Sequence, residues 1–284
     1  MKMTITALTA TILIAAAWCH GANALPIGPY SGISETDHPI DPAIHWTDSR
    51  IAGWATGYDE YYRSDGQTGW SDPSSAFGAP GGSGDIVSLG DLSEGDITAG
   101  MSPGYITMTF DTPITNRLGH DFAVFENGFP FGPGLFAELA YVEVSTDGEH
   151  FARFPSFFDA ADEPIGAFAG LDVTEIYNLA GKHQNGYGTP FDLAQLTSSE
   201  LVQRGRVSLD EINYVRIVDI PGSGDWADSD GNSIFDNWPT TGSGGLDLNA
   251  VGAMNVVPEP GTIILLGAGL GGLFVRRLRN RHSA

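Results

Sequence analysis

The residues best suited to chemistry lie in an acidic loop late in the chain. Four oxygen-bearing residues recur there at even spacing, namely Asp228, Asp230, Asn232 and Asp236. Gly231 permits a sharp turn between them. Carboxylate and amide oxygens spaced in this way can converge on one hard cation, so we predict a calcium site in this loop.

The loop departs from a complete EF-hand at two positions. Ser233 stands where the invariant glycine belongs, and Pro239 stands where the bidentate glutamate belongs. A calcium ion would therefore need further ligands, either a distant carboxylate such as Asp247 or backbone carbonyls. An acidic turn that binds no ion fits the same residues.

Motifs that indicate catalysis are missing from the sequence. It contains no nucleophile elbow, zinc motif or phosphate loop. Four acids could nevertheless pair across strands for glycoside hydrolysis: Asp121, Glu126, Glu138 and Glu143. Because the chain holds 35 acidic residues, some pairs must meet by chance, and we expect a protein that is not an enzyme.

A stretch rich in glycine and aspartate carries six large aromatic residues, Trp46, Trp54, Tyr58, Tyr61, Tyr62 and Trp70. Aromatic faces beside carboxylates are one way to bind sugars, which makes polysaccharide a candidate partner. Packing in the core or in loops is the other interpretation of the same residues.

The carboxyl-terminal segment shows three signals in order. The first is the run Val257, Pro258, Glu259 and Pro260, whose prolines favour an extended and accessible chain. An apolar run follows over residues 262–275, which is short for a stable membrane span but sufficient for a transient helical anchor. The third is an arginine cluster that the positive-inside rule places in the cytoplasm, Arg276, Arg277, Arg279 and Arg281.

This order of elements over residues 257–284 resembles the PEP-CTERM sorting tail. In that family an exosortase of Gram-negative bacteria recognises a Pro-Glu-Pro motif followed by a short hydrophobic helix and arginines. The resemblance implies cleavage near Pro258, Glu259 and Pro260, and release of the body to the cell surface or an exopolysaccharide matrix. A plain carboxyl-terminal membrane anchor is the alternative.

The amino terminus has the three parts of a signal peptide. Lys2 gives a positive start, residues 5–17 are apolar, and Ala22 and Ala24 are the small residues that signal peptidase recognises. We therefore predict cleavage after Ala24 and a mature body over residues 25–256. The single cysteine, Cys19, lies in the removed segment, so disulfides and thiolate chemistry are excluded from the body.

Charge excludes one large class of partner. The chain has a formal net charge of −22, and residues 25–257 contain 8 Lys and Arg against 34 Asp and Glu. A nucleic-acid partner is excluded because phosphate binding needs a basic surface. An acidic surface of this kind suits divalent cations and a soluble exported protein.

The elements that must position these residues are mainly strands. Strand patterns of alternating or continuous apolar residues cover 105–110, 121–126, 141–145, 151–154, 212–220 and 246–254. Only residues 191–201 have a weak helical pattern. Many short strands separated by turns predict an all-β fold, an antiparallel β-sandwich flanked by the two terminal signals.

Two sequence runs carry a second resemblance. Residues 142–148 followed by Phe151, and residues 214–219, look like consecutive strands of discoidin-like, galactose-binding-like jelly rolls. Residues 121–127 and 245–251 also resemble uncharacterised bacterial cell-surface proteins of that kind. The resemblance implies a jelly-roll over roughly residues 100–255, and this architecture hosts many unrelated functions.

These observations predict an exported surface or matrix protein with a non-enzymatic interaction or carbohydrate-binding body. Signal peptidase and exosortase are its expected partners during export, and the membrane holds it through the carboxyl-terminal helix. A secreted carbohydrate-active hydrolase and a purely structural matrix protein remain the alternatives.

Overall fold

The computed structural model of the chain describes residues 42–258. The predicted signal peptide with Ala22 and Ala24, the apolar run 262–275 and the arginine cluster lie outside these residues. Within residues 42–258, no helix has both the length and the apolar character needed to span a bilayer.

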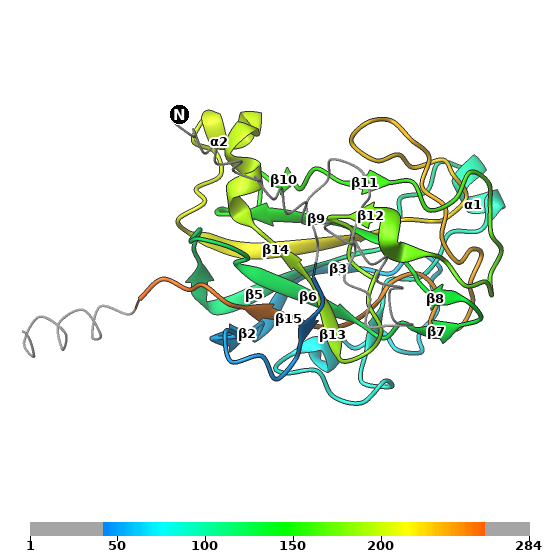
Figure 1. The fold of residues 1–284 in the computed structure, drawn as a ribbon, viewed down its shortest axis with the longest axis horizontal. Coiled ribbons are helices and arrows are strands. Elements are labelled where there is room, and N and C mark those ends of the chain that lie inside the picture. Colours follow the sequence, from blue (N-terminus) through cyan, green and yellow to red (C-terminus); the bar gives the residue numbers. More distant parts are fainter. Residues whose placement is uncertain (1–41, 259–284) are drawn as a thin grey trace, which may run out of the picture.

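Two antiparallel sheets make up most of the body (Figure 1). The six-stranded sheet has the order β1 (Ile44–His45), β13 (Tyr187–Phe191), β6 (Phe122–Glu126), β15 (Asp247–Ala253) and β2 (Gly53–Trp54), with β4 (Val87–Ser88) also paired to β15. The five-stranded sheet has the order β10 (Ala152–Arg153), β9 (Ala140–Ser145), β14 (Ile212–Asp219), β5 (Tyr105–Ile114) and β3 (Gly57–Tyr62).

Smaller elements complete the body. Two short hairpins pair β7 (Phe129–Phe131) with β8 (Gly134–Phe136) and β11 (Phe157–Phe158) with β12 (Ile176–Tyr177). The helices are short: α1 (Glu94–Thr98), α2 (Glu200–Gln203) and three 3₁₀ turns, Pro73–Ala76, Val173–Glu175 and Leu193–Ser198. Ser93 caps α1 through a capping box with Asp96, which explains how so short a helix begins at this point.

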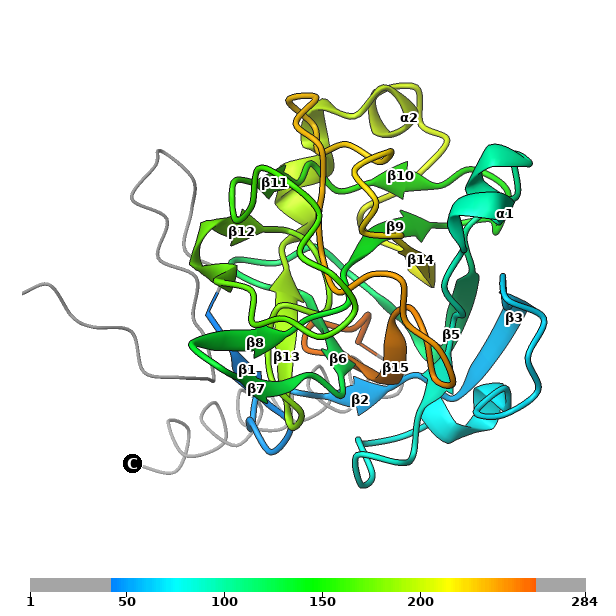
Figure 2. The ribbon, with the colours of Figure 1, turned by 90° about the vertical axis from the view of Figure 1, so that its right-hand side faces the viewer.

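One hydrophobic core joins the two sheets. Figure 2 shows the strands of these sheets from a second direction. Ile106 and Met108 of β5 belong to the same buried cluster as Val124 of β6, because alternate residues of a strand face one side. Three stacked or tilted rings lie in this core with centroids 5.0 to 5.8 Å apart, those of Phe122, Phe154 and Phe191. The apolar residues that the sequence pattern assigns to strands are therefore the ones that bury.

The all-β, antiparallel prediction is confirmed, whereas the jelly-roll likeness stays a prediction. Of the predicted strands, 212–220 and 246–254 match β14 and β15 to within a residue or two at each end. The weak helical pattern over 191–201 corresponds to a 3₁₀ helix over Leu193–Ser198, followed by the short α2 over Glu200–Gln203. Asp192 starts the turn by accepting a hydrogen bond from the Ala194 amide.

The two ends of the body differ. Four long segments form what we call the loop end. They join β4 to β5, β6 to β9, β10 to β13 and β14 to β15, over residues 89–104, 127–139, 155–186 and 220–246. Figure 1 shows α1, β7, β8, β11 and β12 gathered at this end. The described chain finishes at Pro258, beyond the opposite end of β15 (Figure 1).

Candidate ligand-binding site

The predicted calcium loop is organised by Asp228. Its Oδ1 accepts hydrogen bonds from the amides of Asp230 and Asn232, each at 2.9 Å. Its Oδ2 accepts from the Phe158 amide at 2.9 Å and from the Asn232 side-chain amide at 3.0 Å. Four N–H donors therefore occupy the carboxylate, and Asp228 closes the turn and ties it to β11.

The other predicted ligands are not brought to the same point. Asp230 and Asn232 are exposed, whereas Asp236 is buried and accepts a hydrogen bond from the Leu139 amide at 2.6 Å. Asp247 is buried at the start of β15. The structure thus divides the predicted residues between a surface turn and the interior, and calcium binding by the loop stays a prediction.

Beside this turn lies a cleft of about 250 Å³, which we call the aromatic cleft. Its lining residues come from β11 with the segment after it and from the acidic loop: Phe158, Asp159, Ala161, Asp162, Asn232, Ser233 and Phe235. The pairing of β11 with β12 holds one wall, and the Asp228 hydrogen bonds to Phe158 and Asn232 hold the two walls together. Asp228 is therefore a positioning residue for the cleft.

Hydrogen-bond acceptors dominate the polar part of the aromatic cleft. Asp159 and Asp162 present exposed carboxylates, and Asn232 uses its amide nitrogen on Asp228, which leaves its Oδ1 as an acceptor. Ser233 donates its hydroxyl to the carbonyl of Gly224 and can still accept. Phe158 is buried, so the half-buried Phe235 is the ring beside these acceptors, and the combination suits a ligand with many hydroxyl donors on an apolar frame, such as a sugar.

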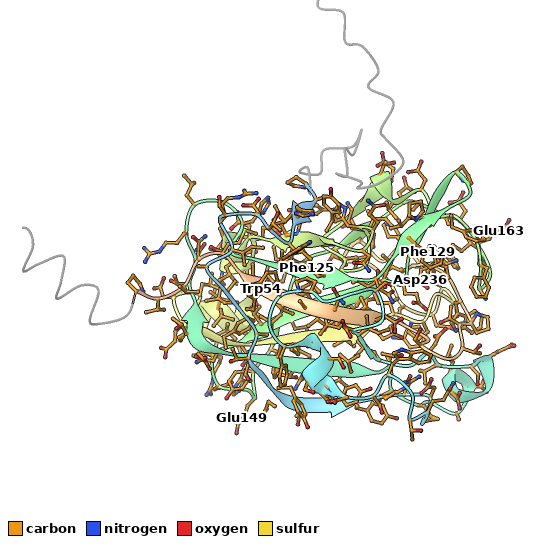
Figure 3. The ribbon with its side chains drawn as sticks, turned by 90° about the horizontal axis from the view of Figure 1, so that it is seen from below. Trp54, Phe125, Phe129, Glu149, Glu163 and Asp236 are labelled. Carbon is orange, nitrogen blue, oxygen red and sulfur yellow. The ribbon has the colours of Figure 1, made fainter. Side chains whose placement is uncertain are left out.

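Exposed aromatic rings lie on neighbouring segments of the loop end. Phe129 stacks on Phe136 with ring centroids 4.7 Å apart, and Phe168 packs against Phe136 at 5.6 Å. Phe168 is 72% exposed and follows the cleft residues on the same segment. Figure 3 shows Phe129 and Glu163 at this end of the body. These rings form an apolar group at the same end of the body as the aromatic cleft.

Beneath this surface the structure buries six acids, which we call the acidic core: Asp91, Glu126, Glu138, Asp219, Asp236 and Asp247. Glu126 ends β6, Asp219 ends β14 and Asp247 begins β15, so these strand ends meet at one end of the fold. Burial raises the pKa of Asp91 and of Asp247 to about 7. Burial also raises the pKa of Glu126, Glu138, Asp219 and Asp236 well above the usual range.

A threonine connects two members of the acidic core. The Thr240 hydroxyl lies 2.6 Å from Glu138 Oε1 and 3.2 Å from Asp91 Oδ2, while its oxygen accepts from the Gly245 amide. One hydroxyl carries one proton, so it can donate to only one of these carboxyls at a time. A proton on one of the two carboxyls supplies the missing donor. The pKa values of Asp91 and Glu138 are both raised, which favours such a proton.

The four acids proposed for glycoside hydrolysis are distributed over separate environments. Asp121 accepts hydrogen bonds from the Arg117 and Leu193 amides, which is a structural role. Glu143 pairs with Arg153 at 2.7 Å across β9 and β10. Glu126 and Glu138 are in the acidic core. None of the four lines the aromatic cleft.

The aromatic residues near the start of the body likewise pack in separate places. Trp54 lies against Phe125 at 5.4 Å, and the Tyr61 hydroxyl donates to the Ser88 carbonyl. Tyr58 packs near Phe77. The remaining three contact or surround other groups, Tyr62 beside Tyr105, Trp46 beside His45, and Trp70 exposed on a loop. Packing therefore accounts for Trp54, Tyr61 and Tyr62, whereas Trp46, Tyr58 and Trp70 are exposed.

Within residues 42–258, one surface group has metal-ligand geometry: Asp147, Glu149 and His150 hold ligand atoms within 4.8 Å of one another. Asp147 accepts hydrogen bonds from the Glu149 and His150 amides and from the His150 ring. These hydrogen bonds lower the pKa of Asp147, and they explain the closeness of the three side chains as the hydrogen bonding of a turn. Figure 3 shows Glu149 at the end opposite Asp236.

The predicted sorting run begins at the edge of the described chain. Val257 donates its amide to the Pro113 carbonyl at 2.9 Å, and Pro258 is exposed. Glu259, Pro260, Arg276, Arg277 and Arg279 lie outside the described residues.

No curated protein matches the chain. Residues 256–280 match the family described as the PEP-CTERM protein-sorting motif, which indicates an exported surface protein sorted by an exosortase.

Proposed function

We propose that the body is a non-enzymatic module that binds neutral polysaccharide through the aromatic cleft, at the surface or in the matrix of a Gram-negative bacterium. The observation that carries this proposal is the cleft itself, in which carboxylate and amide oxygens lie beside the half-buried ring of Phe235. A neutral glycan is favoured over an anionic one because the body is strongly acidic. The two sheets would then form a galactose-binding-like sandwich that serves as the scaffold.

The position of the sorting motif supports this proposal. The described chain leaves the body at the end opposite the loop end (Figure 1). A protein held at the membrane by a tail after residue 258 would direct the aromatic cleft away from that membrane. Such an arrangement suits the capture of extracellular polymer.

We expect the double variant Asp159→Asn, Asp162→Asn to lose about tenfold or more in affinity for polysaccharide. Each change replaces a charged acceptor of sugar hydroxyls by a weaker, neutral one. The measurement is binding of the full chain, purified in mild detergent, to an array of neutral bacterial exopolysaccharides. Asp59→Asn, an exposed acid of β3, is the matched control and should bind as the unaltered chain does.

The same array separates the alternatives. Release of reducing sugar by the unaltered chain, abolished by one Asp→Asn change in the cleft, would establish a hydrolase instead. A chain that binds no glycan in the array and turns none over would favour a purely structural matrix protein.

Sorting gives a second prediction. Replacement of Pro258, Glu259 and Pro260 by alanine should leave the chain in the membrane fraction with its tail attached, because the exosortase loses its recognition motif. Mass measurement of cell-bound and released protein in an exosortase-containing host tests this. Asp230→Ala, remote from the motif, should be released normally, and normal release of the triple variant would contradict the prediction.

A further inference from the structure

Near the start of β15, buried side-chain oxygen atoms lack a hydrogen-bond donor within the described chain. Asn249 is the bulged residue of β15, between the partners of Glu126 and Phe125 on β6. It is 1% exposed, and its Oδ1 accepts no hydrogen bond from any described residue. Its amide nitrogen donates to the Asp85 carbonyl at 2.6 Å, so the amide oxygen faces away from that loop.

A second orphaned oxygen lies in the adjacent strand. Glu126 is 1% exposed; its Oε2 accepts from the Gly128 amide, while its Oε1 has no partner among residues 42–258. Asp247, two residues before Asn249, is the charged group that acts most strongly on Glu126. Its Oδ2 is held by the Asn127 side chain at 3.3 Å. In the register of this strand pair Leu248 lies opposite Glu126, so the two carboxyl residues and Asn249 occupy neighbouring positions of β6 and β15.

Protonation alone does not satisfy this group. A proton can neutralise Glu126 or Asp247, but an amide oxygen does not take up a proton near neutral pH and needs an external donor or a cation. Basic side chains are few here: Arg63 and Lys182 are the Lys and Arg that the described chain buries. Arg63 pairs with Asp65 at 2.6 Å and its charge also favours the ionised form of Asp247, while Lys182 donates to the Ile176 carbonyl.

The chemistry of the three oxygens selects the ligand. Carboxylate and amide oxygens without sulfur or imidazole suit a hard cation such as Ca²⁺, whose remaining positions are filled by carbonyls and water. Within residues 42–258, no three acids of the acidic core hold ligand atoms within 4.8 Å of one another. A site with two carboxylates is compatible with that spacing and with the weak affinity typical of extracellular calcium modules.

We propose that Glu126, Asp247 and Asn249 bind one calcium ion that joins the end of β6 to the start of β15. This site is separate from the acidic loop at 228–236 and from the aromatic cleft, and it does not depend on glycan binding. The ion offsets two buried negative charges and gives the amide oxygen a partner. It thereby fixes the strand ends from which the loop end begins.

Calcium binding to the full chain in mild detergent, stripped with EDTA and dialysed at pH 7.5, tests the proposal by calorimetric titration with CaCl₂. We expect one ion per chain, with a Kd of about 10⁻³ M or tighter. At a hundredfold excess over Kd, the melting temperature should rise by about 5 to 10 °C. Glu126→Gln, which keeps the side-chain shape, should abolish both effects.

Matched variants assign the ion to this site. Asp230→Asn and Glu149→Gln remove acids of the 228–236 loop and of the exposed turn, and both should bind calcium as the unaltered chain does. Asn249→Asp supplies an anionic oxygen in place of the amide and should lower Kd about tenfold. The proposal is overturned by no binding, by loss of binding in Asp230→Asn or Glu149→Gln, or by an unchanged Kd in Asn249→Asp. The Kd of Asn249→Asp tests the proposal even if Glu126→Gln does not fold.

Discussion

Replacement of Asp228 by alanine is expected to lower the free energy of unfolding by about 3 to 5 kcal/mol. The change removes four hydrogen bonds to one charged group and leaves the Phe158 amide, which is buried, without its acceptor. A hydrogen bond to a charged group is worth about 1.5 to 3 kcal/mol, and bonds to one carboxylate are not additive. Urea unfolding of the full chain measures the difference.

The same variant separates two roles for the acidic loop. If Asp228 closes a turn, the loss is the same in EDTA and in calcium, and Asp230→Ala costs little because its side chain is exposed. If the loop instead holds calcium, the loss is larger in calcium than in EDTA, and Asp228→Ala combined with Asp230→Ala lowers the stabilisation that calcium gives. A loss under 1 kcal/mol for Asp228→Ala would show that neither role stabilises the loop.

The strands were predictable because burial imposes a pattern on the sequence. Residues 122–125 are apolar on both parities, and β6 is buried throughout, with neighbours on both sides. Strand β13 escaped prediction because it contains Gly188 and Pro190, which disfavour central strands. Its partner β1 pairs only with Tyr187 and Gly188, so Pro190 has no ladder hydrogen bond to lose on that side.

The candidate sites were less predictable for a topological reason. Asp219 and Glu126 each end an apolar run, which from sequence alone resembles a strand entering solvent. Their burial follows from the order in which the strands pair, which brings positions 126, 219 and 247 to one end. Asp228 was chosen for its spacing, and the structure shows that the spacing serves hydrogen bonds within the turn.

Stability of the calcium-free protein is expected to fall as the pH rises from about 5 to 8. Burial raises the pKa of Asp91 from 3.8 to about 7, and the pKa of Asp219 and Asp236 is also raised well above 3.8 by burial. Between the ordinary aspartate pKa of 3.8 and the raised pKa in the folded protein, the folded state retains protons that the unfolded chain has released. Unfolding therefore becomes more favourable as the pH rises. For Asp91 alone, the part of the shift between pH 5 and about 7 corresponds to about 3 kcal/mol.

The control for this prediction is Asp91→Asn, measured by urea unfolding in EDTA at pH 5 and pH 8. An asparagine oxygen can still accept from the Thr240 amide, which donates to Asp91 Oδ2 at 2.7 Å. Because the amide does not ionise, the variant should lose less stability between the two pH values than the unaltered chain. Exposed Asp72 has a pKa lowered by the Ser74 hydroxyl and amide, so its contribution disappears only at acidic pH and does not oppose the trend. Stability that increased from pH 5 to pH 8 would mean that the acidic core is already ionised and paired in the folded protein.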